Sequence, residues 1–557
     1  MTISSIRNKR PLNHRTIYSG TRKQSGAALS FNTVLRRLAA LALFAAATTL
    51  PAQQPSEPAS AAQPPAPVPY TIRTSTRLVI LDLVVEDSKG HVVDDLKRED
   101  FHVTESGEPQ TVLNFDPSGA HTPAPELNIN STAELDQQAP RAPVNIILLD
   151  EFNTRFEDMA FARYSLKKFL ERQPGKLAIP TMLIAVSLQN FTVLRDYTQN
   201  KDEIISALDH HFSGNPWQAH QYSWVGERYA TAFESLRRVA QAVVGHQGQK
   251  NMIWIGRGFP AVNFANMPVD TENRVYNAVQ ECVNVLRDAR VTLYTIDPAG
   301  LQVYNTYGPA AEFNDPFGGN YQFAKLATAT GGRTLYGRND VDAEIGTAIR
   351  DGSSSYTLTY RPTATVPNPT RFRKIVVTVD RPGVKVYTRE GYYLQRGPGR
   401  VDPVNPSRRL MADLAAADSS TMVYDGVPLR LENLPEKPDS YVIHIEPRSL
   451  AWTYATDTEP RRAEVILMVT TYDKKGKELK REARVIKGSA PPTVPPTGRL
   501  ERGLNLSYDL IPDPKAVRVR FTVRVTASGR IGTVDAVPGQ PVVAAATTHP
   551  AAPSQQN

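Results

Sequence analysis

Residues 144–150 form an almost unbroken apolar run that ends abruptly at an acid, Asp150. Continuous apolar runs of this kind are typical of strands in a parallel sheet that is covered on both faces. A polar turn follows Asp150 and leads into an amphipathic helical pattern at 157–171. Open α/β sheets place their binding crevice at the carboxyl ends of the strands. The run therefore predicts an α/β domain with Asp150 at the rim of its crevice.

Strand and helix patterns alternate from 144 to about 350, which predicts a Rossmann-like, mostly parallel sheet with helices on both faces. Only three residues separate the patterns at 181–187 and 191–195, so these two strands should form an antiparallel hairpin. The other expected strands are 144–149, 251–255, 291–296 and 333–336. The expected helices are 157–171, 201–212, 226–244, 272–289, 320–330 and 340–350.

We expect β modules on both sides of this α/β domain, which we bound at 143–354. Alternating apolar residues predict a small β module at 70–117, and strand patterns at 355–397 predict a β-hairpin extension of the α/β domain. Strict alternation near 517–526 predicts a C-terminal β-sandwich-like domain at 398–536. Its outward row, Arg518, Arg520 and Arg524, is expected on a solvated face. Pro- and Ala-rich composition predicts linkers at 53–69 and 118–142 and a disordered tail at 537–557.

Residues 1–52 carry eight Lys or Arg and no acid, and an apolar stretch at 38–50 follows the basic region. This pattern predicts a secretory signal peptide; a retained N-terminal anchor is the alternative. The stretch is shorter than the roughly 20 residues that span a bilayer, so no membrane span is expected after cleavage. We expect an exported protein: periplasmic, at the cell surface or secreted.

The net charge of +8 comes from that leader, because the remaining 64 − 8 = 56 basic residues balance 56 acidic ones. A neutral body argues against nucleic acid as a partner. Cys282 is the only cysteine, so no internal disulfide can form, and its helical spacing from Val279 and Leu286 predicts a packed core residue.

Several segments, taken in order, resemble the von Willebrand factor A-related family of the acidobacterial type. They are 96–105 (LKREDFHVTE), the strand that ends at Asp150, 296–301 (IDPAGL), 329–333 (ATGGR), 355–362 (SYTLTYRP) and 528–532 (SGRIG). The resemblance covers nearly everything after the leader. It implies a Rossmann-like A domain flanked by β domains, in an exported bacterial protein whose family role is mostly uncharacterised.

Many A domains bind Mg²⁺ through an Asp-x-Ser-x-Ser turn, a Thr from a second loop and an Asp from a third. Here Asp150 and Thr154 remain, but Phe152 and Arg257 stand where the first Ser and the third-loop Asp are expected. A guanidinium at that place opposes a cation. We therefore expect a degenerate metal site and no cofactor; an Mg²⁺ ion would have to rely on Asp150, Thr154 and Ser213. Alternatively, Asp150 pairs with Arg257 across the crevice, either as part of a binding site or as a purely structural pair.

Four loops at 150–157, 213–225, 256–271 and 298–319 should emerge at the carboxyl end of the sheet, and the last three contain aromatic residues among Gly, Asn and Pro. Long loops of this composition suit adaptable recognition of a protein or glycan partner, although the rings could instead pack on one another. The candidate partner-binding residues are Asp150, Asn153, Thr154, Trp217, Tyr222, Trp224, Arg257, Phe259, Tyr304 and Tyr307.

No nucleophile elbow, zinc-protease helix or phosphate loop occurs in the chain. We therefore expect a non-enzymatic interaction, adhesion or scaffold protein. One alternative is an extracytoplasmic hydrolase that uses Asp150, Glu151 and a histidine from 210–220; general acid–base chemistry requires these groups within hydrogen-bond reach. Another is a passive component of the cell envelope. The identity of the partner and the oligomeric state stay open.

Overall fold

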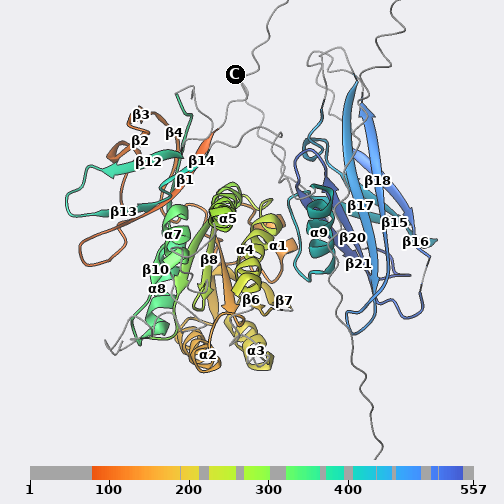
Figure 1. Ribbon diagram of the computed structural model, residues 1–557, viewed down its shortest axis with the longest axis horizontal. Coiled ribbons are helices and arrows are strands. Elements are labelled where there is room, and N and C mark those ends of the chain that lie inside the picture. The colour runs from red at the N-terminus through yellow and green to blue at the C-terminus, as the bar shows by residue number, and fades with distance from the viewer. Residues whose placement is uncertain are drawn as a thin grey trace, which may run out of the picture. The chain divides into compact units, whose positions relative to one another are not determined.

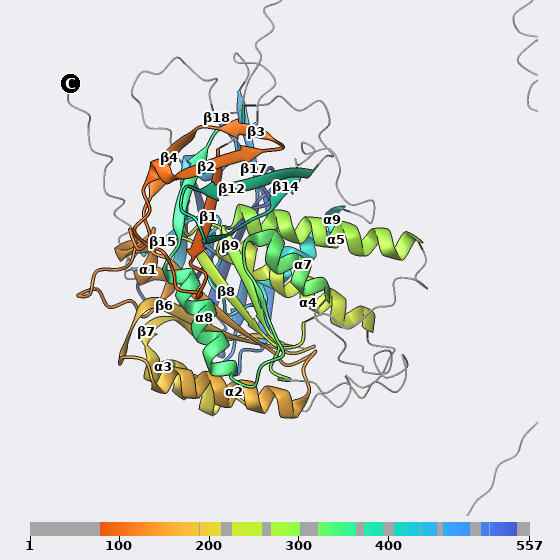
Figure 2. The same ribbon diagram turned by 90° about the vertical axis from the view of Figure 1, so that its left-hand side faces the viewer.

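The computed structural model describes residues 78–188, 190–212, 225–258, 269–300, 321–363, 372–393, 406–434, 436–453, 460–490, 503–511 and 513–542. Figures 1 and 2 show their arrangement in two orthogonal views. All of these described residues belong to one compact unit. In the described part of the chain, no helix combines the length and the apolar character needed to cross a membrane.

A six-stranded sheet in the order β10-β9-β8-β5-β6-β7 forms the centre of the α/β domain. β5 pairs in parallel with β6 and β8, and β9 pairs in parallel with β8 and β10. β7 runs antiparallel to β6, which confirms the predicted hairpin. The strands are β5 (Val144–Asp150), β6 (Lys176–Val186), β7 (Phe191–Asn200), β8 (Lys250–Ile255), β9 (Val291–Ile296) and β10 (Thr334–Leu335).

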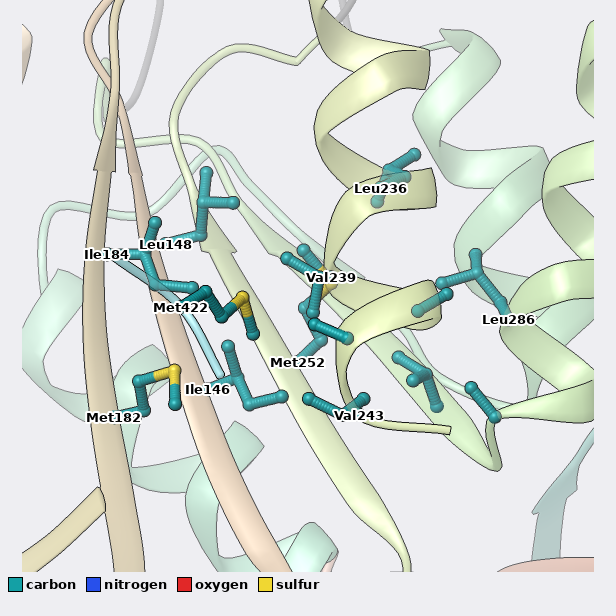
Figure 3. Packing of buried hydrophobic residues seen from close by; sticks show 14 of the residues in the cluster. Ile146, Leu148, Met182, Ile184, Leu236, Val239, Val243, Met252, Leu286 and Met422 are labelled. Atoms are coloured by element: carbon teal, nitrogen blue, oxygen red, sulfur yellow. The ribbon is translucent and has the colours of Figure 1, made fainter. Parts of the chain in front are cut away.

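Helices cover both faces of this sheet (Figure 2). All seven residues of β5 are buried, because alternate side chains serve opposite cores: Ile147 and Leu149 face one, Ile146 and Leu148 the other. The first core contains α2 (Phe156–Glu171), α3 (Lys201–His210) and α8 (Val341–Ser353). The second contains α4 (Val225–Ala242), α5 (Val269–Asp288) and α7 (Tyr321–Thr330), and Figure 3 shows part of it.

The N-terminal β module is built from two separate stretches of chain. β1 lies between β11 and β13 in one sheet, and β12 pairs with β2 in the other. Residues 355–393 therefore complete this module and do not extend the α/β domain, contrary to the prediction. The strands are β1 (Val79–Glu86), β2 (Phe101–Glu105), β3 (Glu108–Gln110), β4 (Val112–Asp116), β11 (Tyr356–Tyr360), β12 (Phe372–Val379), β13 (Lys385–Thr388) and β14 (Gly391–Tyr393).

Residues 118–142, predicted to be a linker, are folded onto the α/β domain. They contain the helix α1 (Thr132–Gln138), which begins where the Ser131 side chain accepts a hydrogen bond from the Glu134 backbone N–H. Ile129 and Leu135 are fully buried in the second core. Pro- and Ala-rich composition predicted a linker, but two apolar anchors are enough to dock this short segment.

The C-terminal domain contains two sheets, β15-β16-β19 and β18-β17-β20-β21, whose residues share one apolar core. The sequence predicted β structure here but missed the helix α9 (Pro406–Ser419), which packs on β17 and β20. The strands are β15 (Leu429–Leu434), β16 (Lys437–Ile445), β17 (Arg461–Tyr472), β18 (Glu478–Ala490), β19 (Leu504–Asp509), β20 (Arg518–Val525) and β21 (Ile531–Ala536).

Arg520 corrects the prediction of a solvated arginine row on β20. Its side chain is buried, and its Nε and Nη2 donate to the two carboxylate oxygens of Asp535, each at 2.7 Å. Its Nη1 donates to the carbonyl oxygens of Ala417 and Met422 at 3.2 and 3.3 Å. The guanidinium thus satisfies carbonyl groups at and beyond the last turn of α9, where helices lack internal donors. The alternation of apolar and polar residues predicted that one face of β20 points to the core. It could not predict that the helix α9 covers the other face.

Residues 420–427, between α9 and β15, insert into the α/β domain. Met422 and Tyr424 belong to the second core, and Met422 lies among Ile184, Met252 and other α/β residues in Figure 3. The Asp425 carboxylate accepts hydrogen bonds from the backbone N–H groups of Gly245 (2.7 Å) and His246 (3.0 Å). The C-terminal domain therefore supplies part of the packing of its neighbour.

Candidate functional site

The predicted rim residue, Asp150, is the last residue of β5 and is fully buried. Its Oδ1 accepts a hydrogen bond from the backbone N–H of Asn153 at 2.9 Å. Its Oδ2 accepts from Trp254 Nε1 at 3.0 Å and from the backbone N–H of Gly258 at 3.3 Å. Three donors from two strand ends therefore engage both oxygens of this carboxylate.

Burial raises the pKa of Asp150 to about 7, against the lowering effects of Trp254, of the Asn153 N–H and of the Arg228 guanidinium. Arg228 lies in the first turns of α4 and is also fully buried. Its Nη2 donates to Oδ1 of Asn153. The guanidinium, the amide and the carboxylate thus form one buried polar group, and Arg228 supplies its positive charge.

The sequence analysis did not single out Arg228, although the pattern of α4 contains a signal. Arg228 precedes Ala232, Ser235 and Val239 at helical spacing, and all three are buried. A charged residue on the same face of a helix as these buried residues is expected to be buried too. It then needs a partner inside the protein, because an unpaired buried charge is costly.

The aromatic rings of Phe152 and Trp254 pack against each other next to Asp150. Phe152 is the residue that the resemblance places at the first serine position of a metal site, and its ring is 1% exposed. The two rings meet edge to face, with centroids 6.2 Å apart and planes at 86°. This packing orients the Trp254 indole, whose Nε1 then donates to Asp150. Phe152 therefore offers no oxygen ligand and instead packs against the residue that donates to Asp150.

The loop after β8 approaches the turn after β5 very closely. Thr154 Oγ1 accepts a hydrogen bond from the backbone N–H of Arg257 at 3.1 Å. A Cβ on Gly256 would lie 2.3 Å from Asp150 Cβ and 2.7 Å from Thr154 Oγ1. Glycine is therefore required at this position for the two loops to touch.

Arg257 is brought to the same edge, but its partner is not Asp150. Its Nε lies 3.6 Å from Oδ2 of Asp297, the residue that follows β9. No ion pair joins Arg257 to Asp150 within the described residues; the Asp150 hydrogen bonds come from Asn153, Trp254 and Gly258. The Asp150–Arg257 pair that was one alternative is therefore not formed: Arg257 lies beside Asp297, and the positive charge near Asp150 comes from Arg228.

Glu151 and His211 form a second polar contact at this edge. His211 Nε2 lies 2.8 Å from Glu151 Oε1, and both side chains are largely buried. Arg163 of α2 donates to the carbonyl oxygens of Leu208 (2.5 Å) and His211 (2.6 Å), which holds the end of α3 at this position. A histidine therefore lies within hydrogen-bond reach of Glu151.

Six of the predicted partner-binding residues, and one predicted metal ligand, lie outside the described residues: Trp217, Tyr222, Trp224, Phe259, Tyr304, Tyr307 and Ser213. The described residues that flank their segments are informative. His211 contacts Glu151, Arg228 contacts Asn153, and Gly258 contacts Asp150. The described residues next to the segments 213–224 and 259–268 therefore lie at the carboxyl edge at Asp150.

The residues at this edge do not fit a divalent cation. Asp150 and Thr154 already accept hydrogen bonds from the protein, and a buried guanidinium lies in electrostatic reach of Asp150. Mg²⁺ would need several free oxygen ligands in octahedral geometry. In the described part of the chain, no group of three or more His, Cys, Asp or Glu side chains is placed to hold a metal.

Comparisons with known proteins add little to this geometry. No family model matches the chain, and no curated protein is similar to it. Among solved structures, the chain is similar to the VWA domain of SpRpn10, with 14% sequence identity and a TM-score of 0.16. That likeness covers 28% of this chain and 89% of the other.

Proposed function

We propose that the chain is an exported, non-enzymatic recognition protein, in which an A-type α/β domain binds a protein or glycan partner without a metal ion. The carboxyl edge of the sheet, with the segments that start there, would form the contact. The β modules would position this edge. The closed hydrogen-bond network of Asp150 is the observation that carries the proposal.

The charges at this edge favour recognition without a metal ion. In an A domain with a complete site, the ion offers a positive charge to an acid of the partner. Here Arg228 places a positive charge beside Asp150, yet both side chains are fully buried and inaccessible to a partner. Recognition would then depend on the segments around this edge. Their sequences contain Trp217 and Trp224, two of the four tryptophans in the chain, and tryptophan is enriched among residues that dominate binding energy.

We expect no shift of the thermal midpoint with Mg²⁺, Mn²⁺ or Ca²⁺ relative to chelator. An ion present at a concentration of about 100 times its Kd would add about 2.7 kcal/mol to stability, which the thermal midpoint would report clearly.

Capture of the partner from an envelope extract should survive chelation. It should be lost in the Trp217→Ala/Trp224→Ala double variant and kept in Trp452→Ala, a control in the C-terminal domain. Stabilisation by metal, or unchanged capture by the double variant, would contradict the proposal.

The contact between His211 and Glu151 favours a second candidate, the extracytoplasmic hydrolase. A carboxylate that orients a histidine is the arrangement used for general base catalysis. If this holds, the chain should hydrolyse activated esters or peptides, and His211→Gln and Glu151→Gln should each lower kcat by at least about 100-fold. Absence of turnover, or equal turnover in the wild type and both variants, would remove this candidate.

A further inference from the structure

β18 (Glu478–Ala490) is a 13-residue strand at one end of the β18-β17-β20-β21 sheet. Among the described residues only β17 pairs with it, along twelve positions. The other side of β18 therefore presents a row of backbone N–H and C=O groups without a neighbouring strand. Val485, in the centre of β18, is 59% exposed. β18 is thus available to pair with another strand.

The charges on β18 alternate along the face that it shares with the sandwich core. Glu482 stands opposite Val469 and Arg484 opposite Leu467, two core residues of β17. Lys480 completes the series, and Glu482 forms ion pairs with Lys480 (2.7 Å) and Arg484 (3.3 Å) within the strand. A row of lysines would keep other strands away. A row of alternating acidic and basic residues permits pairing, because the basic residues of an antiparallel copy can lie opposite the acidic residues of the first copy.

We propose that two copies of this chain associate through β18, paired antiparallel about a two-fold axis at Ala483. In this register Ala483 faces itself, and Glu482 of each copy faces Arg484 of the other. In this register every even-numbered residue faces an even-numbered residue of the other copy. Side chains alternate along a strand, so the core faces of the two sheets lie on the same side of the joined sheet. The two sandwiches then share one continuous eight-stranded sheet, and the contact is isologous.

The side chains select this register over its neighbours. An axis at Glu482 would set Glu482 against itself and Lys480 against Arg484, which are like charges. An axis at Arg481 would set the two Arg481 guanidinium groups, which carry like charges, against each other on the axis. At Ala483 the small side chain leaves room on the axis. The aliphatic stem of Arg481 then lies opposite the exposed Val485 and can cover it.

The experiment is a charge swap read by sedimentation equilibrium and light scattering on the full chain. We expect the wild type to have twice the mass of one chain. Glu482→Arg and Arg484→Glu should each set like charges opposite on both sides of the axis and raise the dimer Kd by at least about tenfold. The double variant Glu482→Arg/Arg484→Glu restores opposite charges and should restore the dimer.

Two further variants separate the interface from general charge effects and from misfolding. Lys487→Glu changes the charge of the same strand by the same amount as Arg484→Glu, at a side chain that is 78% exposed, and should leave the Kd nearly unchanged. Ala483→Arg places bulk and charge on the axis and should give monomers with an unaltered circular dichroism spectrum. A monomeric wild type, dimeric single variants, or a double variant that stays monomeric would each overturn the proposal.

Discussion

Replacing Arg228 by methionine is expected to lower the free energy of unfolding by about 2–3 kcal/mol at pH 8, because the buried Asn153 amide oxygen loses its charged donor. Asp150 keeps its hydrogen bonds from Asn153, Trp254 and Gly258 but loses the nearby positive charge. Methionine matches much of the volume, so the loss reports charge more than packing. Urea unfolding of both proteins measures the difference.

The loss should depend on pH in a direction set by Asp150. Burial raises its pKa to about 7, so the native carboxyl is mostly protonated at pH 5 and mostly ionised at pH 8. A neutral carboxyl needs no counter-charge, so the variant should lose less stability at pH 5 than at pH 8. Arg238→Met on the same helix is the control: Arg238 is partly exposed and pairs with Glu234 at 3.0 Å, and about 1 kcal/mol or less is expected. Equal losses for both variants would contradict the role given to Arg228.

Replacing Met422 by alanine is expected to cost about 2–5 kcal/mol, the range for large-to-small changes in a packed core. Met422 comes from the C-terminal chain but is 1% exposed in the core beside β5 and β6. The cavity would therefore open in the α/β domain, although the substitution lies outside its sequence limits. Because the two parts share this core, we expect one cooperative unfolding transition that shifts as a whole.

Met411→Ala on α9 is the matched control, since the same atoms are removed from a side chain that is 42% exposed. Its expected cost is about 0.5 kcal/mol or less. Calorimetry distinguishes the cases. Two separate transitions, with only the C-terminal one shifted by Met422→Ala, would show that residues 420–427 do not stabilise the α/β domain.

The parts of the fold that the sequence predicted well are those determined locally. The β5 run, the 181–195 hairpin and the helices of the α/β domain follow from apolar periodicity over a few residues, and the structure confirms them. The pairing of β11 and β13 with β1 was missed because it joins residues far apart in the chain. Arg520 was misplaced for the same reason, since only tertiary structure brings α9 over its face.

The candidate site divides in a similar way. Asp150, Thr154 and Arg257 were placed at one edge because strand ends in a parallel sheet meet there, and the structure brings them together. Their partners could not be predicted. Arg257 contacts Asp297, and the charge beside Asp150 comes from Arg228, a helix residue that is 78 positions further along the chain (228 − 150 = 78). Spacing alone does not choose between two arginines that could reach one carboxylate.

The entry and exit of the α/β domain have a mechanical consequence. Asp116, where the chain leaves β4, and Thr357, where it returns in β11, are Cα partners in one antiparallel ladder. Tension applied along the chain can pass directly from β4 to β11 through the hydrogen bonds of that ladder. The sheet that carries Asp150 is a side branch of that path, and force reaches it instead from the C-terminal domain through Met422 and Tyr424, which pack in its core.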